Sequence, residues 1–177
     1  MAAKRIVAIW RRRLVHPIVR QRNAGRRIAR ARQARARAKR ILSEAPDPSS
    51  LLDGFEESLR ALLARARKKC SRVLLVRQPW LEKTFTREEG KRLWMFGAGR
   101  ARTETTTTYY AHEVVWKLLR RIDERLLRVA EDLGVDTLDL GPVVPPTFDL
   151  WYDEMHHNAR GCERIGLAVA EELLKGR

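Results

Sequence analysis

The amino-acid sequence predicts an α/β protein with a parallel sheet, because amphipathic helices alternate with short apolar strands along its second half. Apolar side chains recur every three or four residues over 51–66, the pattern of a helix with one face on a core. The runs 72–77 and 135–140 are short and apolar, and each is followed by a proline-containing turn, so we expect buried strands there. Further helices are expected over about 111–133 and 159–174.

The first 45 residues differ sharply in charge from the rest of the chain. They hold 15 Lys and Arg against one acid, Glu44, whereas the remaining residues hold 22 basic and 21 acidic side chains. A break this sharp indicates two regions with different physical roles. It falls at the proline-rich hinge 45–50, where Ser residues and Asp53 can cap a following helix. The expected division is a basic helical region, 1–45, followed by an α/β region, 46–177.

The basic region is expected to be helical. Arg and Ala are strong helix formers, and from residue 6 to residue 41 they predict two basic helices, interrupted at His16-Pro17 and at Gly25. The apolar content of these helices is thin. They therefore need a partner surface to be stable.

Several classes of protein are disfavoured by composition. The apolar runs are shorter than the roughly 20 residues that cross a bilayer, and no apolar segment follows the basic start as in a cleavable signal, so the cytoplasm is the default expectation. Cys70 and Cys162 lie far apart and show no zinc-ligand spacing. We expect no disulfide framework, no metal and no cofactor.

The segment 81–110 is rich in charge, glycine and threonine, and its run 100–110 has no helical or strand period. Loops that follow the carboxyl ends of parallel strands form the ligand crevice of open α/β sheets, so the segment could be a substrate wall or lid. An ordinary surface loop with a helix cap at Thr107 or Thr108 is an equal alternative.

Two side chains near the end of the chain suggest proton-transfer chemistry. Asp153 and His156 lie three residues apart, just before the last expected helix. A carboxylate this close can accept the Nδ1 hydrogen of the imidazole and leave the other ring nitrogen for a nucleophile, as in the base half of a catalytic triad. Alternatively, Asp153 caps the helix or the turn before it, or a metal binds here with His157 and the distant His112.

The run Asp153-x-x-His156-x-Asn158-x-x-Gly161 resembles the last block of SGNH/GDSL-type serine ester hydrolases, which read Asp-x-x-His-Pro-Asn-x-x-Gly-His. His157 and Cys162 depart from the usual proline and histidine. The resemblance covers about residues 51–177 and implies the C-terminal part of a three-layer, flavodoxin-like α/β/α domain. It implies that Asp153 and His156 are the catalytic pair.

The family's nucleophile and oxyanion-hole blocks have no counterpart in this chain. No serine stands in a Gly-Asp-Ser or Gly-x-Ser-x-Gly setting, and neither Asn23 nor Asn158 lies in Gly-x-Asn-Asp. Two strands are expected where such a domain has about five. We expect a start codon placed too far downstream or a truncated gene copy, or else a partial sheet with another function.

The leading hypothesis is hydrolysis of an ester or acyl bond of a small molecule, glycan or lipid, with a serine from outside this chain. The alternative is a basic protein that binds nucleic acid or an anionic surface, or a catalytically silent fragment. The residue that activates the nucleophile would be His156, oriented by Asp153. Substrate and oligomeric state stay open. The candidate aromatic residues of a cleft are Trp80, Tyr109, Tyr110 and Trp151.

Overall fold

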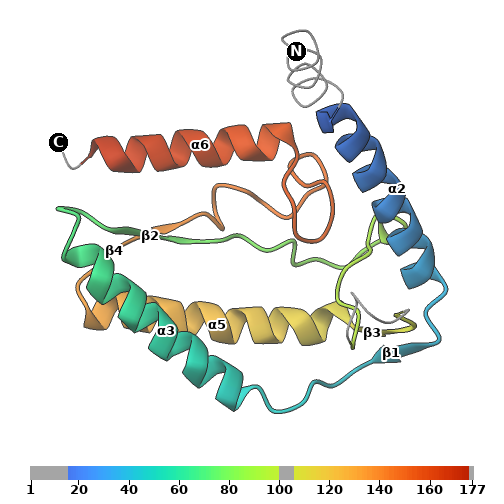
Figure 1. The fold of residues 1–177 in the computed structure, drawn as a ribbon, viewed down its shortest axis with the longest axis horizontal. Coiled ribbons are helices and arrows are strands. Elements are labelled where there is room, and N and C mark those ends of the chain that lie inside the picture. The colour runs from blue at the N-terminus through green and yellow to red at the C-terminus, as the bar shows by residue number, and fades with distance from the viewer. Residues whose placement is uncertain (1–15, 100–105, 176–177) are drawn as a thin grey trace, which may run out of the picture.

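The structure is a computed structural model that describes residues 16–99 and 106–175. Figure 1 shows two helices below a short sheet, one helix above it and a further helix at one end. In chain order the elements are α2 (His16–Ala36), β1 (Arg40–Leu42), α3 (Ser49–Arg67), β2 (Leu74–Arg77), α4 (Arg87–Gly90), β3 (Thr108–Tyr110), α5 (His112–Asp132), β4 (Asp136–Asp139) and α6 (Ala159–Leu174).

The two strands expected from the sequence are present and pair with each other, but they are not buried as expected, since β2 is only partly buried and β4 is largely exposed. β2 and β4 run parallel, in a register that places Leu74 opposite Asp136 and Arg77 opposite Asp139. Helices α3 and α5 lie on one side of this pair and α6 on the other (Figure 1). The coarse α/β class with parallel strands is therefore confirmed.

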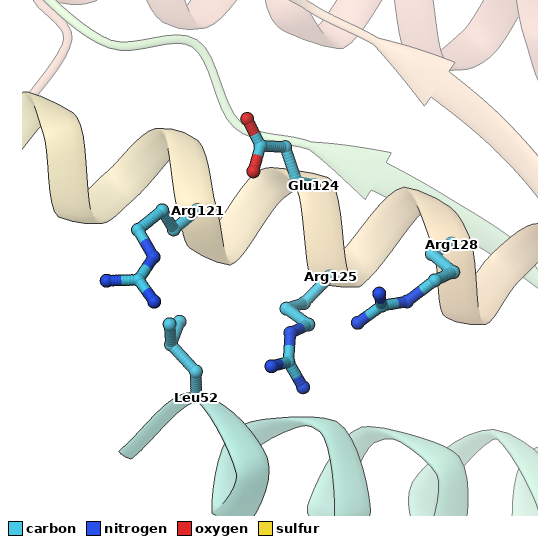
Figure 2. A pocket seen from close by; sticks show the side chains of 5 residues that line it. All are labelled: Leu52, Arg121, Glu124, Arg125 and Arg128. Carbon is cyan, nitrogen blue, oxygen red and sulfur yellow. The ribbon is translucent and has the colours of Figure 1, made fainter. Parts of the chain in front are cut away.

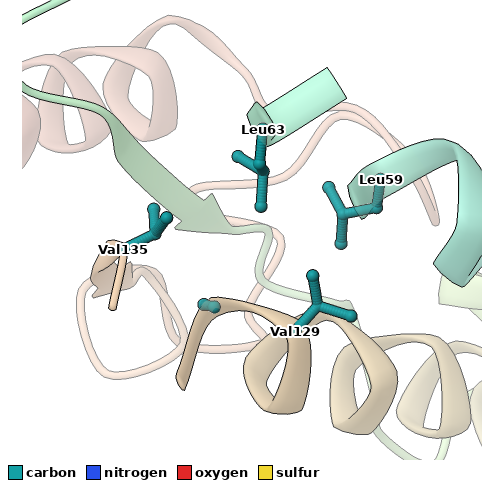
Figure 3. Packing of buried hydrophobic residues seen from close by; sticks show 5 residues of the cluster. Leu59, Leu63, Val129 and Val135 are labelled. Carbon is teal, nitrogen blue, oxygen red and sulfur yellow. The ribbon is translucent and has the colours of Figure 1, made fainter. Parts of the chain in front are cut away.

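One hydrophobic core joins the sheet to the helices beneath it. Leu59 and Leu63 of α3 pack against Val129 and Ala130 of α5 and against Val135, which precedes β4 (Figure 3). Burying a Leu or Val side chain contributes about 1.5–3 kcal/mol. These contacts explain the helical period of the apolar stripe of α3, since its buried residues pack in the core, although Leu51 and Leu62 of the same stripe are more than half exposed.

The helices of the α/β region end where the sequence predicts, but two expected caps are wrong. Gly134 has a positive φ of 59°, the left-handed conformation that stops a helix at low cost in glycine, and it follows α5 directly. The residue before α5 is Ala111, with no side-chain cap, and Thr108 lies in β3 instead. At the start of α3, Asp47 rather than a serine or Asp53 accepts the Ser49 backbone hydrogen, at 3.1 Å.

A second parallel pair was not expected. β1 pairs with β3, with Arg40 opposite Thr108 and Leu42 opposite Tyr110. The sequence suggested helix as far as Ile41 and no regular structure over 100–110, so both expectations are wrong where the structure describes them. Each strand is only three residues long, and such strands form because a distant partner supplies the hydrogen bonds.

The described part of the basic region forms one helix, α2, followed by β1. α2 continues through Gly25 without a break, which corrects the expected interruption there. The ten residues 27–36 after this glycine are Arg, Ala, Ile and Gln, all adequate or strong helix formers, and they outweigh the cost of about 1 kcal/mol for one interior glycine. The first of the two expected helices lies mostly outside the described residues. Within the described part, no helix is long and apolar enough to cross a membrane.

Candidate functional site

The segment before α6 is a closed loop that presents the Asp-His pair. Its ends are joined by backbone hydrogen bonds from Tyr152 N to His156 O, at 2.8 Å, and from Asn158 N to Leu150 O, at 3.0 Å. Beneath the loop, Trp151 is fully buried with Leu150 in a second core cluster. The loop is therefore fixed to a packed base, which is what a side-chain pair with a defined geometry needs.

The glycine and asparagine of the motif fix the angle between this loop and α6. Asn158 caps α6: its Oδ1 accepts the Gly161 backbone hydrogen at 3.1 Å, and its Nδ2 donates to Asp149 O at 2.8 Å. A Cβ atom on Gly161 would lie 2.2 Å from Leu150 O. Only glycine allows the first turn of α6 to approach the loop this closely.

Asp153 is buried and accepts several hydrogen bonds. Its side chain is 0% exposed, and Nδ1 of His156 lies 2.9 Å from Oδ1 and 3.0 Å from Oδ2. The backbone N–H groups of Met155 and His156 donate to Oδ1, and the indole N–H of Trp94 donates to Oδ2 at 2.7 Å. Burial raises the pKa of Asp153, yet the hydrogen bonds outweigh burial and hold that pKa below its ordinary value.

His156 has one face on Trp94 and the rest open to solvent. Its side chain is 57% exposed, and the Trp94 ring lies parallel to the imidazole with the ring centroids 6.2 Å apart. Nδ1 is engaged by Asp153, and no described residue hydrogen-bonds to Nε2. The pair therefore combines an oriented imidazole with a free ring nitrogen. Asp153 also closes the turn by accepting the backbone hydrogens of Met155 and His156. The same carboxylate therefore has the contacts expected of a turn cap and those expected of the partner of a catalytic imidazole.

The pair opens onto a groove of about 1040 Å³. Its walls come from α2, from the segment 94–97, from the region of β3 and from the Asp-His loop. They comprise Ala24, Arg27, Ile28, Arg30, Ala31, Ala34, Trp94, Met95, Phe96, Gly97, Thr106, Tyr109, Tyr152, Asp153 and His156. The segment 81–110, expected as a substrate wall or a plain loop, thus supplies part of the wall beside His156.

Phe96 is held in a backbone conformation that is rare for a bulky residue. Its φ is 67°, in the left-handed region, which costs such a residue about 1–3 kcal/mol. The strain is maintained by a hydrogen bond from Tyr110 N to Phe96 O at 2.9 Å and by the bridge between Gly97 and Tyr109. Strained residues of this kind cluster at functional sites, and this one lines the groove.

Glu154, next to Asp153, fixes the facing segment. It is 1% exposed, and its Oε1 accepts the backbone hydrogens of Trp94, at 2.8 Å, and Met95. Burial raises the pKa of Glu154 above its ordinary value, and Oε2 has no partner among the described residues. Trp94 is therefore held twice, through its backbone by Glu154 and through its indole by Asp153.

Two arginines fasten α2 to the site. Arg32 donates to Arg92 O at 3.0 Å and lies over the Tyr152 ring, and Arg35 donates to Met95 O at 2.6 Å. Such hydrogen bonds from a guanidinium are stronger than neutral ones. The partner surface that the thin apolar content of α2 requires is thus the segment beside the Asp-His loop.

No protein-family model, curated protein or solved structure matches this chain.

The structure separates the aromatic residues suggested by the sequence. Tyr109 lines the groove, whereas Trp151 is core and Tyr110 lines a separate hollow beside the hinge. The indole of Trp80 donates to buried Asp123 at 2.9 Å. Trp94 and Tyr152, which do line the groove, were missed.

Signals for Trp94, Arg35 and Glu154 were weak in the sequence. The role of a tryptophan in a charged loop can be recognised only when its spatial neighbours are known. In the sequence, Glu154 cannot be distinguished from an exposed surface glutamate. Arg35 is one of many arginines in its region. Their roles depend on contacts with residues about 60 positions away.

His157 and His112 do not join the pair. The His157 ring packs on Trp151 with centroids 4.1 Å apart, and its Nε2 is buried. His112 is 9% exposed in an aromatic cluster beside Arg35, and burial with that positive charge lowers its pKa to about 4. No group of three His, Cys, Asp or Glu side chains suited to a metal occurs in residues 16–99 and 106–175.

None of the described serines lines the groove, and all five serines of the chain are described. The hydroxyl groups at its walls belong to Thr106, Tyr109 and Tyr152. A nucleophilic serine for His156 therefore has no candidate in this part of the chain.

A smaller pocket of about 80 Å³ between α3 and α5 is lined by three arginines together with Leu52 and Glu124 (Figure 2). Arg125 and Arg128 both donate to Glu56, at 2.7 and 2.9 Å. The hydrogen bonds from Arg125, Arg60 and Arg128, in that order of size, lower the pKa of Glu56 to about 2. These ion pairs join the two helices and engage two of the three arginines of the pocket.

Proposed function

We propose that this chain carries the acid/base half of a serine ester hydrolase of the SGNH/GDSL type. His156 would take the proton of an attacking hydroxyl through Nε2 and return it to the leaving alcohol. Asp153 would hold the imidazole through Nδ1 and stabilise its protonated form. The chain would then correspond to the C-terminal part of a three-layer α/β/α domain, and the serine would come from outside it.

The observation that carries the proposal is the pairing of a buried carboxylate with an exposed imidazole at the mouth of a groove. A capping aspartate needs only the backbone hydrogens of Met155 and His156. Asp153 also contacts Nδ1 of His156, at 2.9 Å, and the Trp94 indole. The tautomer this contact favours leaves Nε2 as a proton acceptor.

The chemistry of the pair can be tested by supplying the missing hydroxyl as a small alcohol. Trifluoroethanol and p-nitrophenyl acetate are mixed with the full chain, and release of p-nitrophenolate is followed by absorbance. The alcohol oxygen forms a bond to the acyl carbon while the bond to the aryl oxygen breaks. The alcohol proton passes to Nε2 and then to solvent or to the leaving phenolate.

We expect a protein-dependent rate that rises with alcohol concentration and falls about a hundredfold in His156→Ala, the usual size of a general-base contribution. The matched control is His157→Ala, which removes the neighbouring imidazole, whose Nε2 is buried. Equal rates in the wild-type chain and His156→Ala would refute the proposal.

A further inference from the structure

We propose that the groove binds a single-chain anionic amphiphile, with its negative group at Arg27 and Arg30 of α2 and its apolar chain along the groove. One part of this inference rests on the proposed function: the ligand would be the alcohol or acyl part of the ester that His156 would act on. The binding itself is independent of catalysis.

The first argument is that the arginines of α2 fall into two groups with different contacts. Arg32 and Arg35 are committed to backbone carbonyls of the opposite segment. Arg27 and Arg30 are exposed, line the groove and take part in no ion pair among the described residues. The helix is held in place by one pair of cations, so the second pair is presented at a fixed position.

The second argument is the balance of charge within the groove. Asp153 is the acidic residue among those that line it, and its oxygens are already occupied by His156, Trp94 and backbone hydrogens. The two arginines therefore face no competing carboxylate on the described walls. A guanidinium binds phosphate or carboxylate oxygens through paired hydrogen bonds, so an anion is the complementary ligand.

The third argument is the character of the remaining walls. Ile28, Ala31 and Ala34 face the groove from α2. Met95, Phe96 and Tyr109 line it from the other elements, and Phe96 is held there by a strained backbone. Apolar walls with a few charged groups at one side are typical of sites for amphiphilic small molecules. Among the described residues that line the groove, the arginines are Arg27 and Arg30, which suits one anionic group better than the successive phosphates of a nucleic acid.

The test measures binding of decyl phosphate to the full chain by calorimetry, at ligand concentrations below micelle formation. Inorganic phosphate and decyl maltoside serve as comparison ligands, because one carries the charge without the chain and the other the chain without the charge. We expect decyl phosphate to bind about tenfold or more tightly than either, since both parts of the site contribute.

The double variant Arg27→Gln/Arg30→Gln is expected to weaken decyl phosphate binding about tenfold and to leave decyl maltoside binding unchanged. The matched control is Arg26→Gln/Arg37→Gln, which removes the same charge from exposed residues on or just after α2 that do not line the groove. An equal loss in both double variants, or equal binding of all three ligands, would overturn the inference. So would tighter binding of a single-stranded oligonucleotide than of decyl phosphate.

Measuring decyl phosphate binding and ester cleavage on the same wild-type chain separates this inference from the proposed function. Binding without ester cleavage would support the inference and refute the hydrolase. Ester cleavage that depends on His156, without binding of decyl phosphate, would refute the inference alone.

Discussion

Two glycines of the last helix provide a sharp test of how the site is assembled. Gly161 and Gly166 both lie in α6, but a Cβ on Gly161 would meet Leu150 O at 2.2 Å, whereas a Cβ on Gly166 meets nothing within 4 Å. Ordinary contact between these atoms begins near 3.4 Å. The first turn of α6 or the loop would therefore have to move by more than 1 Å to admit an alanine at position 161.

We expect Gly161→Ala to lower the free energy of unfolding by about 1–3 kcal/mol, the cost of forcing extra atoms into a packed contact. Gly166→Ala should raise it by about 0.5–1 kcal/mol, because alanine is the better helix former. For a chain of this size, each kcal/mol moves the melting temperature by about 2–4 °C. Urea unfolding followed by circular dichroism measures both variants.

The same variants report on the Asp-His pair. Displacement of the loop in Gly161→Ala should reduce the alcohol-dependent ester cleavage, whereas Gly166→Ala should leave it unchanged. The reasoning fails if Gly161→Ala is as stable as Gly166→Ala, since the contact with Leu150 would then impose no constraint.

Three further predictions concern the groups around the site. The depressed pKa of His112, about 4 against an ordinary 6.5, contributes stability that is present above pH 6.5 and is lost as the pH falls towards 4. That gap corresponds to up to about 3 kcal/mol, and His112→Phe should flatten this part of the pH profile of urea unfolding. Trp94→Phe removes the indole hydrogen bond to Asp153, so it should lower the free energy of unfolding by about 1.5–3 kcal/mol and slow the alcohol-dependent ester cleavage. If both quantities are unchanged, Trp94 does not position Asp153. Asp123→Ala should lower the free energy of unfolding by about 2–3 kcal/mol, because Asp123 is 4% exposed and accepts hydrogen bonds from Arg77 and Trp80. Asp139 is the exposed partner of the same arginine, so Asp139→Ala should lower it by less than about 1 kcal/mol. Equal losses in the two variants would contradict this ranking.

In the α/β region, local sequence patterns predict several of the elements that the structure contains. The stripe of α3, the glycine stop after α5 and the strands around Leu75 and Leu138 were all predictable, because each expresses a local periodicity or a local turn preference. The contact between Asp153 and His156 was also predictable, since three residues of a loop span it.

The sequence by itself determined these local elements and the short-range pair at the site. Only the tertiary structure decided that β1 pairs with β3, that α2 runs unbroken and that its arginines divide into two that anchor the helix and two that face the groove. The same holds for the contacts of Trp94 with Asp153 and Glu154, which join segments about 60 residues apart in the chain. The physical reason is that a hydrogen bond or a packed contact between distant segments depends on where the whole fold places them, and neither periodicity nor propensity encodes that placement.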